Sequence, residues 1–106
     1  MWIANGNDLI MAEGDYGVAL PFTFKGMTFG ASDCVAFVFK KSMNGTDILT
    51  KVFSNIQNST VNLEFTEAES ALFPKGQYIY RVDSYQNGNY KNNLIKLASL
   101  KVDDIA

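Results

Sequence analysis

The chain has 106 residues and a formal net charge of −2; 47% of its residues are hydrophobic and 19% are charged. This balance is typical of a globular protein and excludes a disordered chain, and the length favours a single domain spanning residues 1–106. The nine basic residues are scattered and form no basic tract, so we expect no nucleic-acid partner.

Short segments of high β-propensity alternate with turn-forming residues along the first half of the chain. They predict strands at residues 8–12, 16–24, 34–40 and 48–54. Pro21 has no amide hydrogen to donate to a sheet, so the second of these strands is expected at an edge or bent at this residue. In the third, apolar side chains alternate onto both faces, so we expect both faces to be covered.

The second half of the chain predicts three more strands, at residues 60–65, 77–86 and 90–102. Thr66 and Glu69 have the spacing of a capping box, which predicts one or two helical turns after the first of these strands. Asn87-Gly88 is the strongest hairpin signal in the chain, and it predicts a two-residue turn between the last two strands.

The last strand carries two apolar pairs in opposite phase. Ile95 and Leu97 share one face of a regular strand, whereas Leu100 and Val102 share the other. A bulge near residues 98–99 would bring both pairs to the core. Taken together, the segments predict an all-β fold, an antiparallel β-sandwich of about seven strands with one short helical turn, and a small barrel is the alternative.

The residues that usually carry chemistry are scarce. The chain has no histidine, which removes the commonest general base and metal ligand. Cys34 is the only cysteine, so no internal disulfide can form, and its apolar strand predicts a buried, inert thiol. The glycines fall at separated turns and no calcium-loop spacing occurs. We therefore expect no enzyme, no catalytic residue, no cofactor and no metal site.

Carboxylate pairs are the remaining route to a small enzyme. A helix cap explains Glu69 beside Glu67, and Asp103 and Asp104 lie at a chain end, where fixed geometry is not expected. Two acids from different strands could still meet in a cleft. No such pair can be named from the sequence.

Aromatic residues, 13% of the chain, are the candidate binding groups. Tyr85 and Tyr90 flank the predicted hairpin turn, either as exposed ligand contacts or as a cross-strand pair that closes the hairpin. Tyr78 and Tyr80 alternate as core residues do. An open edge at residues 16–24 would add two further aromatic contacts. The candidate partner-binding residues are therefore Tyr16, Phe22, Tyr85 and Tyr90. A sugar-stacking platform would draw on Trp2, Tyr78, Tyr80, Tyr85 and Tyr90.

The order of these signals resembles the N-terminal domain of the baseplate upper protein of tailed phages that infect Gram-positive bacteria. The similarity covers nearly the whole chain. It rests on Gly14-Asp15 after the first strand, Val35-Ala36-Phe37-Val38-Phe39-Lys40, Val61 to Thr66 running into Glu69-Ser70-Ala71-Leu72, and the ending Leu100-Lys101-Val102. The segment Gly76-Gln77-Tyr78-Ile79-Tyr80-Arg81-Val82 is similar to the family's Gly-x-Tyr-x-Tyr-x-Val strand. The glycine expected before the terminal valine is replaced by Ala98-Ser99.

The resemblance implies an immunoglobulin-like β-sandwich that docks onto other baseplate or tail proteins, with no reaction and no cofactor. The expected location is then the virion, after synthesis in the host cytoplasm. The first residues form neither a secretory signal nor a membrane anchor, so no membrane partner is expected. The partner is expected to be such a protein or a second copy of the chain in an oligomer, and a carbohydrate-binding module is the alternative function.

Overall fold

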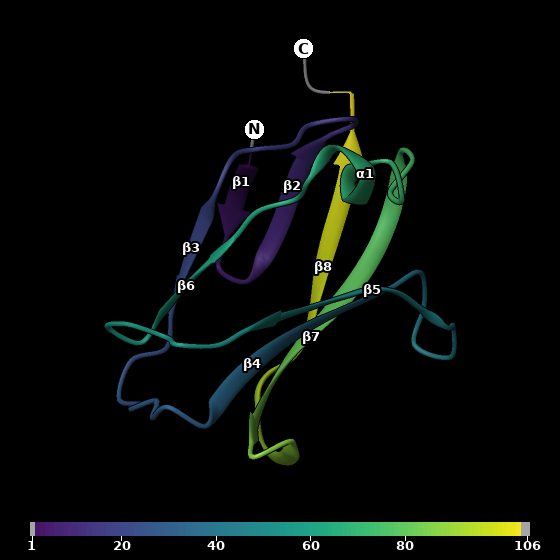
Figure 1. Ribbon diagram of the computed structural model, residues 1–106. Coiled ribbons are helices and arrows are strands. Elements are labelled where there is room, and N and C mark those ends of the chain that lie inside the picture. The colour runs from purple at the N-terminus through teal and green to yellow at the C-terminus, as the bar shows by residue number, and fades with distance from the viewer. Residues whose placement is uncertain (1, 105–106) are drawn as a thin grey trace.

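The computed structural model describes residues 2–104 of the chain, and these form eight strands and one short helix. The strands are β1 (Trp2–Asn5), β2 (Asp8–Ala12), β3 (Leu20–Thr23), β4 (Asp33–Lys40), β5 (Asp47–Phe53), β6 (Thr60–Leu63), β7 (Gly76–Gln86) and β8 (Asn89–Asp103); the helix is α1 (Glu67–Ser70). Six strands form a large sheet in the order β1-β2-β8-β7-β4-β5, and β3 and β6 form a small one. Figure 1 shows the two long strands, β7 and β8, at the centre of the large sheet.

The large sheet is mixed, which corrects the prediction of an antiparallel sandwich. Its neighbours run antiparallel except for β2 and β8, which pair in parallel with Leu9 opposite Leu100 and Met11 opposite Val102. The parallel pair joins the first and last parts of the chain. Local patterns predict hairpins but carry no information about such a long-range pairing.

The core lies between the two sheets. Side chains of alternate residues on β4, Val35, Phe37 and Phe39, point to one face of the large sheet and are fully buried. The small sheet covers this inner face: Phe22 of β3 packs edge-to-face on Phe37 at a centroid distance of 5.0 Å. On β6, Val61 is buried and Asn62 is exposed, which confirms the predicted alternation.

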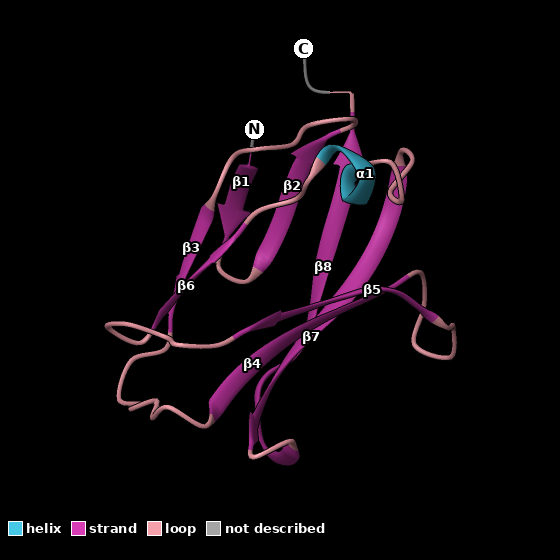
Figure 2. Cartoon of the chain, in the orientation of Figure 1, coloured by secondary structure: helices cyan, strands magenta, loops and turns pink. Residues whose placement is uncertain are grey.

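The short helix closes one end of the core (Figure 2). Thr66 and Glu69 form the predicted capping box, in which the Thr66 side chain accepts from the Glu69 amide and the Glu69 carboxylate accepts from the Thr66 amide. The same carboxylate receives a hydrogen bond from Lys51 of β5 at 2.8 Å. One glutamate therefore ties the helix to an edge strand of the large sheet.

The β7–β8 hairpin has the predicted turn. Asn87 and Gly88 have positive φ angles of 51° and 79°, as a two-residue hairpin turn of the favoured hand requires. The β7–β8 register shifts at three places, and the bulge that separates the two apolar pairs lies elsewhere than predicted. Tyr80 pairs with Ala98 and Val82 with Ile95, so the extra residue falls at residues 96–97. Leu97 consequently leaves the core and is 52% exposed.

Two strand predictions differ from the structure near the start of the chain. β1 was not expected, although the Asn5-Gly6 turn signal between it and β2 is present in the sequence, and Gly6 has a φ of +63°. The strand predicted at residues 16–24 is only Leu20–Thr23. Gly17, with a φ of +78°, interrupts the extended backbone before it, and its amide bonds the Phe65 carbonyl instead. In the described part of the chain, no helix is long and apolar enough to span a membrane.

Candidate functional site

The two faces of the large sheet are covered very differently. The small sheet and α1 pack on the inner face, whereas no strand or helix of the described residues covers the opposite side, which we call the outer face. Five of the eight exposed large apolar side chains in residues 2–104 lie on it: Ile3, Met43, Val52, Tyr90 and Leu97. On β4 the outer-face residues Ala36 and Val38 are nonetheless buried, as its apolar pattern predicts, although no strand or helix of the described residues lies over them.

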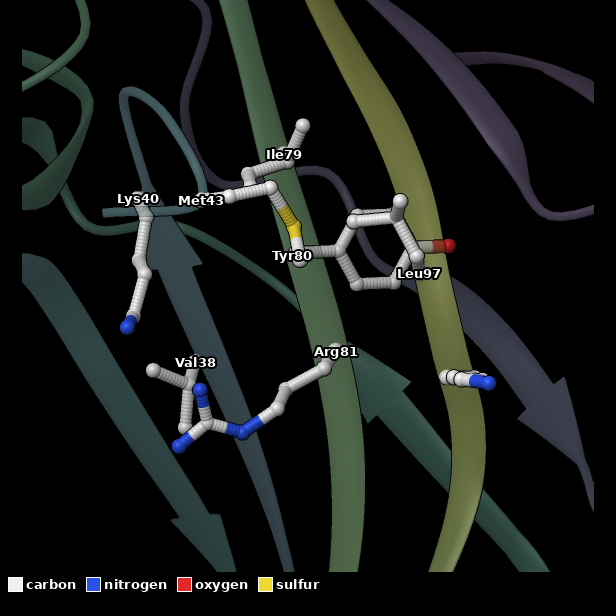
Figure 3. Close-up of a pocket in the computed structure, with 8 residues that line it drawn as sticks. Val38, Lys40, Met43, Ile79, Tyr80, Arg81 and Leu97 are labelled. Atoms are coloured by element: carbon white, nitrogen blue, oxygen red, sulfur yellow. The ribbon is translucent and has the colours of Figure 1, made fainter. Parts of the chain in front are cut away.

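Side chains of neighbouring strands shield β4 on this face instead. Val38 is only 4% exposed although no second layer lies over it. Its cross-strand neighbours are Arg81 on β7 and Thr50 on β5. Figure 3 shows the Arg81 side chain extending from β7 across the sheet, so that its guanidinium lies beside Val38. A long cationic side chain covers apolar surface with its methylene groups while its charged end stays hydrated.

A pocket of about 80 Å³ lies at the centre of the outer face. Three strands and the β4–β5 loop form it, and its lining residues are Val38, Lys40, Met43, Ile79, Tyr80, Arg81, Lys96 and Leu97. The bulge in β8 explains why consecutive residues, Lys96 and Leu97, both line it. In a regular strand they would point to opposite faces, but here both stand opposite Arg81.

The Arg81 guanidinium is held in place from one side only. Its Nε donates to Asp83 Oδ2 at 2.9 Å, and the other carboxylate oxygen accepts from Asn93 Nδ2 at 2.8 Å. Asp83 is buried, so these two donors satisfy a carboxylate that would otherwise be costly to bury. The hydrogen bond with Asp83 raises the pKa of Arg81 above its ordinary value. Neither Nη atom of Arg81 bonds a described residue.

Three cations line the pocket and no carboxylate does. Lys40 Nζ lies 3.6 Å from Asp47 Oδ1, a carboxylate outside the lining. Lys96 forms no ion pair within residues 2–104. The centre of the outer face therefore combines apolar contact surface with positive charge that neighbouring acids balance only in part.

The structure brings together two of the four predicted partner-binding residues. Tyr85 and Tyr90 lie directly opposite each other on the outer face, with ring centroids 6.0 Å apart and planes at 82°. This is the cross-strand pair that the sequence offered as one of two explanations. Tyr16 is exposed in the segment before β3, and Phe22 is half-buried with its ring against the core.

The predicted edge strand is paired on one side. β3 pairs with β6 along its whole length, including Pro21 opposite Asn62. The Phe24 amide donates to the Ser59 carbonyl. Because backbone amides of a strand point alternately to its two sides, the nitrogen of Pro21, three residues earlier, faces the open side. The missing donor therefore lies on the edge where another strand would have to add.

The other sequence candidates are occupied by structural contacts. Tyr78 and Tyr80 are buried, as predicted, and burial raises the pKa of both phenols. Trp2 is half-buried against Phe65, and its Nε1 donates to the Val18 carbonyl at 2.8 Å. Cys34 is half-buried on the outer face rather than fully buried.

The carboxylates that are neighbours in the sequence form structural hydrogen bonds and ion pairs. Partial burial pushes the pKa of Glu69 upward, but hydrogen bonds from Lys51 and the Thr66 amide outweigh it and leave the pKa below its ordinary value. Asp103 and Asp104 both lie close to Lys75, at 3.9 and 2.7 Å. Across residues 2–104, no group of three metal-binding side chains lies close enough to hold a metal ion.

Sequence reasoning missed the central pocket. Two features of the sequence could have indicated it. Ile79 and Arg81 alternate with the core residues of β7 and so point to the opposite face, and the apolar pattern of β8 changes phase. No family profile matches the chain, and no curated protein or solved structure matches it at the significance required. The geometry of the outer face is that of an uncovered sheet surface with exposed apolar side chains and a cationic centre.

Proposed function

We propose that this protein is a non-catalytic docking module, and that it attaches to other baseplate or tail proteins of a phage or prophage virion through the outer face. The observation that carries the docking role is the uncovered outer face itself, over which five exposed large apolar side chains are distributed. Apolar side chains on a sheet face that nothing in the described residues covers are a feature of interaction sites. The virion assignment rests on the sequence resemblance to the baseplate upper protein family.

The size of the outer face supports this role. Six strands about 4.8 Å apart, averaging about eight residues that each rise about 3.3 Å, span roughly 630 Å² in projection. A specific interface buries roughly 800 Å² of accessible surface on each partner, and accessible area exceeds projected area on a corrugated sheet. One face of this sheet therefore suffices for a specific contact.

The strand edges support contact through the face rather than through strand addition. Pro21 removes one donor from the open edge of β3, and β1 has only four residues. The opposite edge strand, β5, carries Lys51 pointing inward to α1. Inward-pointing charges, prolines and short strands are the usual means of protecting sheet edges from pairing.

The immunoglobulin-like sandwich implied by the resemblance belongs to this same proposal. Two β layers packed around one core are consistent with it. The division into six and two strands differs from the four-and-three division of an immunoglobulin constant domain. The likeness therefore extends to the two packed layers but not to the number of strands in each.

The carbohydrate-binding alternative has less support. A sugar-stacking platform needs exposed rings in one plane. The ring planes of the two outer-face tyrosines, Tyr85 and Tyr90, are nearly perpendicular to each other. Trp2, Tyr78 and Tyr80 pack in or against the core. A glycan screen that shifts the unfolding temperature would favour this alternative over docking.

The test uses two leucines of similar exposure on different surfaces. Leu97 lies on the outer face and is 52% exposed, whereas Leu72 follows α1 and is 46% exposed. Self-association is measured by light scattering over a dilution series, and binding to each purified baseplate and tail protein of the same virion by interferometry. Leu97→Glu should weaken whichever association occurs at least about tenfold, while Leu72→Glu leaves it unchanged. A protein that neither self-associates nor binds any of these partners, or equal effects of both changes, would refute the proposal.

A further inference from the structure

The pocket at the centre of the outer face is the right size for a single side chain. Its volume of about 80 Å³ is well below the roughly 300 Å³ of the smallest typical small-molecule sites. It is also larger than the space one water molecule needs, roughly 15 Å³ on a comparable measure. Met43, Ile79 and Leu97 supply apolar walls. An apolar side chain presented by a larger partner fits this description better than a free metabolite.

The charge around the pocket defines what should lie next to that side chain. Asp83 holds the Arg81 guanidinium through Nε, and this leaves both Nη groups free to donate. Lys96 has no ion-pair partner in the described residues. An arginine held in a fixed orientation with free Nη groups is the usual partner of a carboxylate. The pocket thus presents an apolar cavity beside a preorganised carboxylate-binding group.

A second copy of the chain is a poor occupant for the same reason. If two copies met through this pocket about a two-fold axis, the three lining cations of one would face those of the other, with no lining carboxylate to separate them. Like charges brought together in an interface oppose association. The charge pattern therefore selects a partner with the opposite sign.

We propose that this pocket binds a protein segment in which an apolar side chain, the size of leucine, adjoins a glutamate or aspartate. The apolar side chain enters between Met43, Ile79 and Leu97, and the carboxylate pairs with Arg81 and Lys96. This inference rests on the proposed docking role of the outer face, and it adds the chemistry of the partner at the centre of the contact.

The test uses short capped peptides and the ¹⁵N-labelled full chain. Three peptides differ at one position each: one contains Leu-Glu, one Leu-Gln and one Ala-Glu within the same polar sequence. Amide shifts are recorded up to millimolar peptide, a range that detects weak single-segment binding. The Leu-Glu peptide should shift amides at Val38, Arg81 and Leu97, and should bind about tenfold more tightly than either of the others. Equal binding of the three, shifts elsewhere, or no shifts would each overturn the proposal.

Two lysine variants serve as matched controls for charge. Lys96→Gln removes the unpaired cation of the pocket, and Lys25→Gln removes an exposed cation in the loop after β3 that also forms no ion pair in the described residues. Neither change removes a buried partner, so both proteins should fold. Lys96→Gln should weaken the Leu-Glu peptide severalfold and Lys25→Gln should not; an equal effect contradicts a local carboxylate site.

The two proposals fail in distinguishable ways. If Leu97→Glu disrupts binding to a partner protein while Lys96→Gln does not and the peptides cause no shifts, docking through the outer face stands and the carboxylate pocket is wrong. If Leu97→Glu leaves partner binding unchanged, the docking role itself is wrong.

Discussion

Replacing each of two leucines in β8 by alanine tests which face of this strand carries stability. Leu100 is fully buried on the inner face, opposite Leu9 on one side and Tyr78 on the other. Leu97, three residues earlier, is 52% exposed on the outer face. Leucine to alanine removes three carbons, worth about 2.4 kcal/mol of transfer free energy when fully buried. A buried site adds a cavity cost, so we expect Leu100→Ala to lose about 3–4 kcal/mol.

The same arithmetic gives a much smaller value for the exposed leucine. About half of the transfer free energy applies to Leu97, and a surface site relaxes without leaving a cavity, so the loss should be about 1 kcal/mol or less. Urea unfolding followed by circular dichroism measures both variants, with an unchanged slope as the check that only stability has altered. A loss at Leu97 equal to that at Leu100 would refute the placement of the bulge at residues 96–97. It would favour the bulge at residues 98–99 that the apolar pattern alone suggests.

Three further changes test local features. Thr66→Ala removes the capping box and should lower the free energy of unfolding by about 1 kcal/mol, whereas Thr66→Ser should retain most of it, as measured by urea unfolding. Gly88→Ala places a side chain at a φ of +79° in an otherwise open turn and should cost about 1 kcal/mol in the same assay; no loss would contradict the turn geometry. The folded-state pKa of Glu69 lies below its ordinary value of 4.5, so its contribution to stability is fully present above that pH and is lost as pH falls through the lower folded value. Stability measured from pH 6 to about pH 3 should therefore fall more steeply in the wild type than in Glu69→Gln.

Features set by neighbouring residues could be predicted from the sequence. The capping box needs only Thr66 and Glu69, and the hairpin turn needs only Asn87-Gly88, so both were found in place. The burial of Val61 and the exposure of Asn62 could likewise be predicted, because successive residues of a strand point to opposite faces of the sheet.

Features set by distant residues could not be predicted in this way. The parallel pairing of β2 with β8 makes the sheet mixed, and it depends on a contact between Leu9 and Leu100 across nearly the whole chain. The position of the bulge depends on which residue of β7 lies opposite, since Tyr80 pairs with Ala98 and Val82 with Ile95. The apolar pattern of β8 required a bulge somewhere but did not determine where.

The candidate site was missed for a related reason. In the sequence, Arg81 and Lys96 are isolated cations outside any basic tract, so no motif distinguishes them. They acquire a role only when the bulge places Lys96 beside Leu97 and the register places both opposite Arg81. A binding surface built from ordinary side chains is visible in the pairing register and not in any motif.

The cationic side chains of the outer face have two consequences that reinforce each other. In the free protein, the methylene groups of Arg81 cover Val38 while its guanidinium stays at the surface. The apolar side chain at the centre of an uncovered sheet is thereby shielded from solvent. The same charge opposes pairing with another copy of the face, as charged residues do on exposed sheet edges. For the proposed partner segment with a carboxylate, the same charge is attractive. On the proposal above, a sheet face of this composition favours a surface of opposite charge over a second copy of itself.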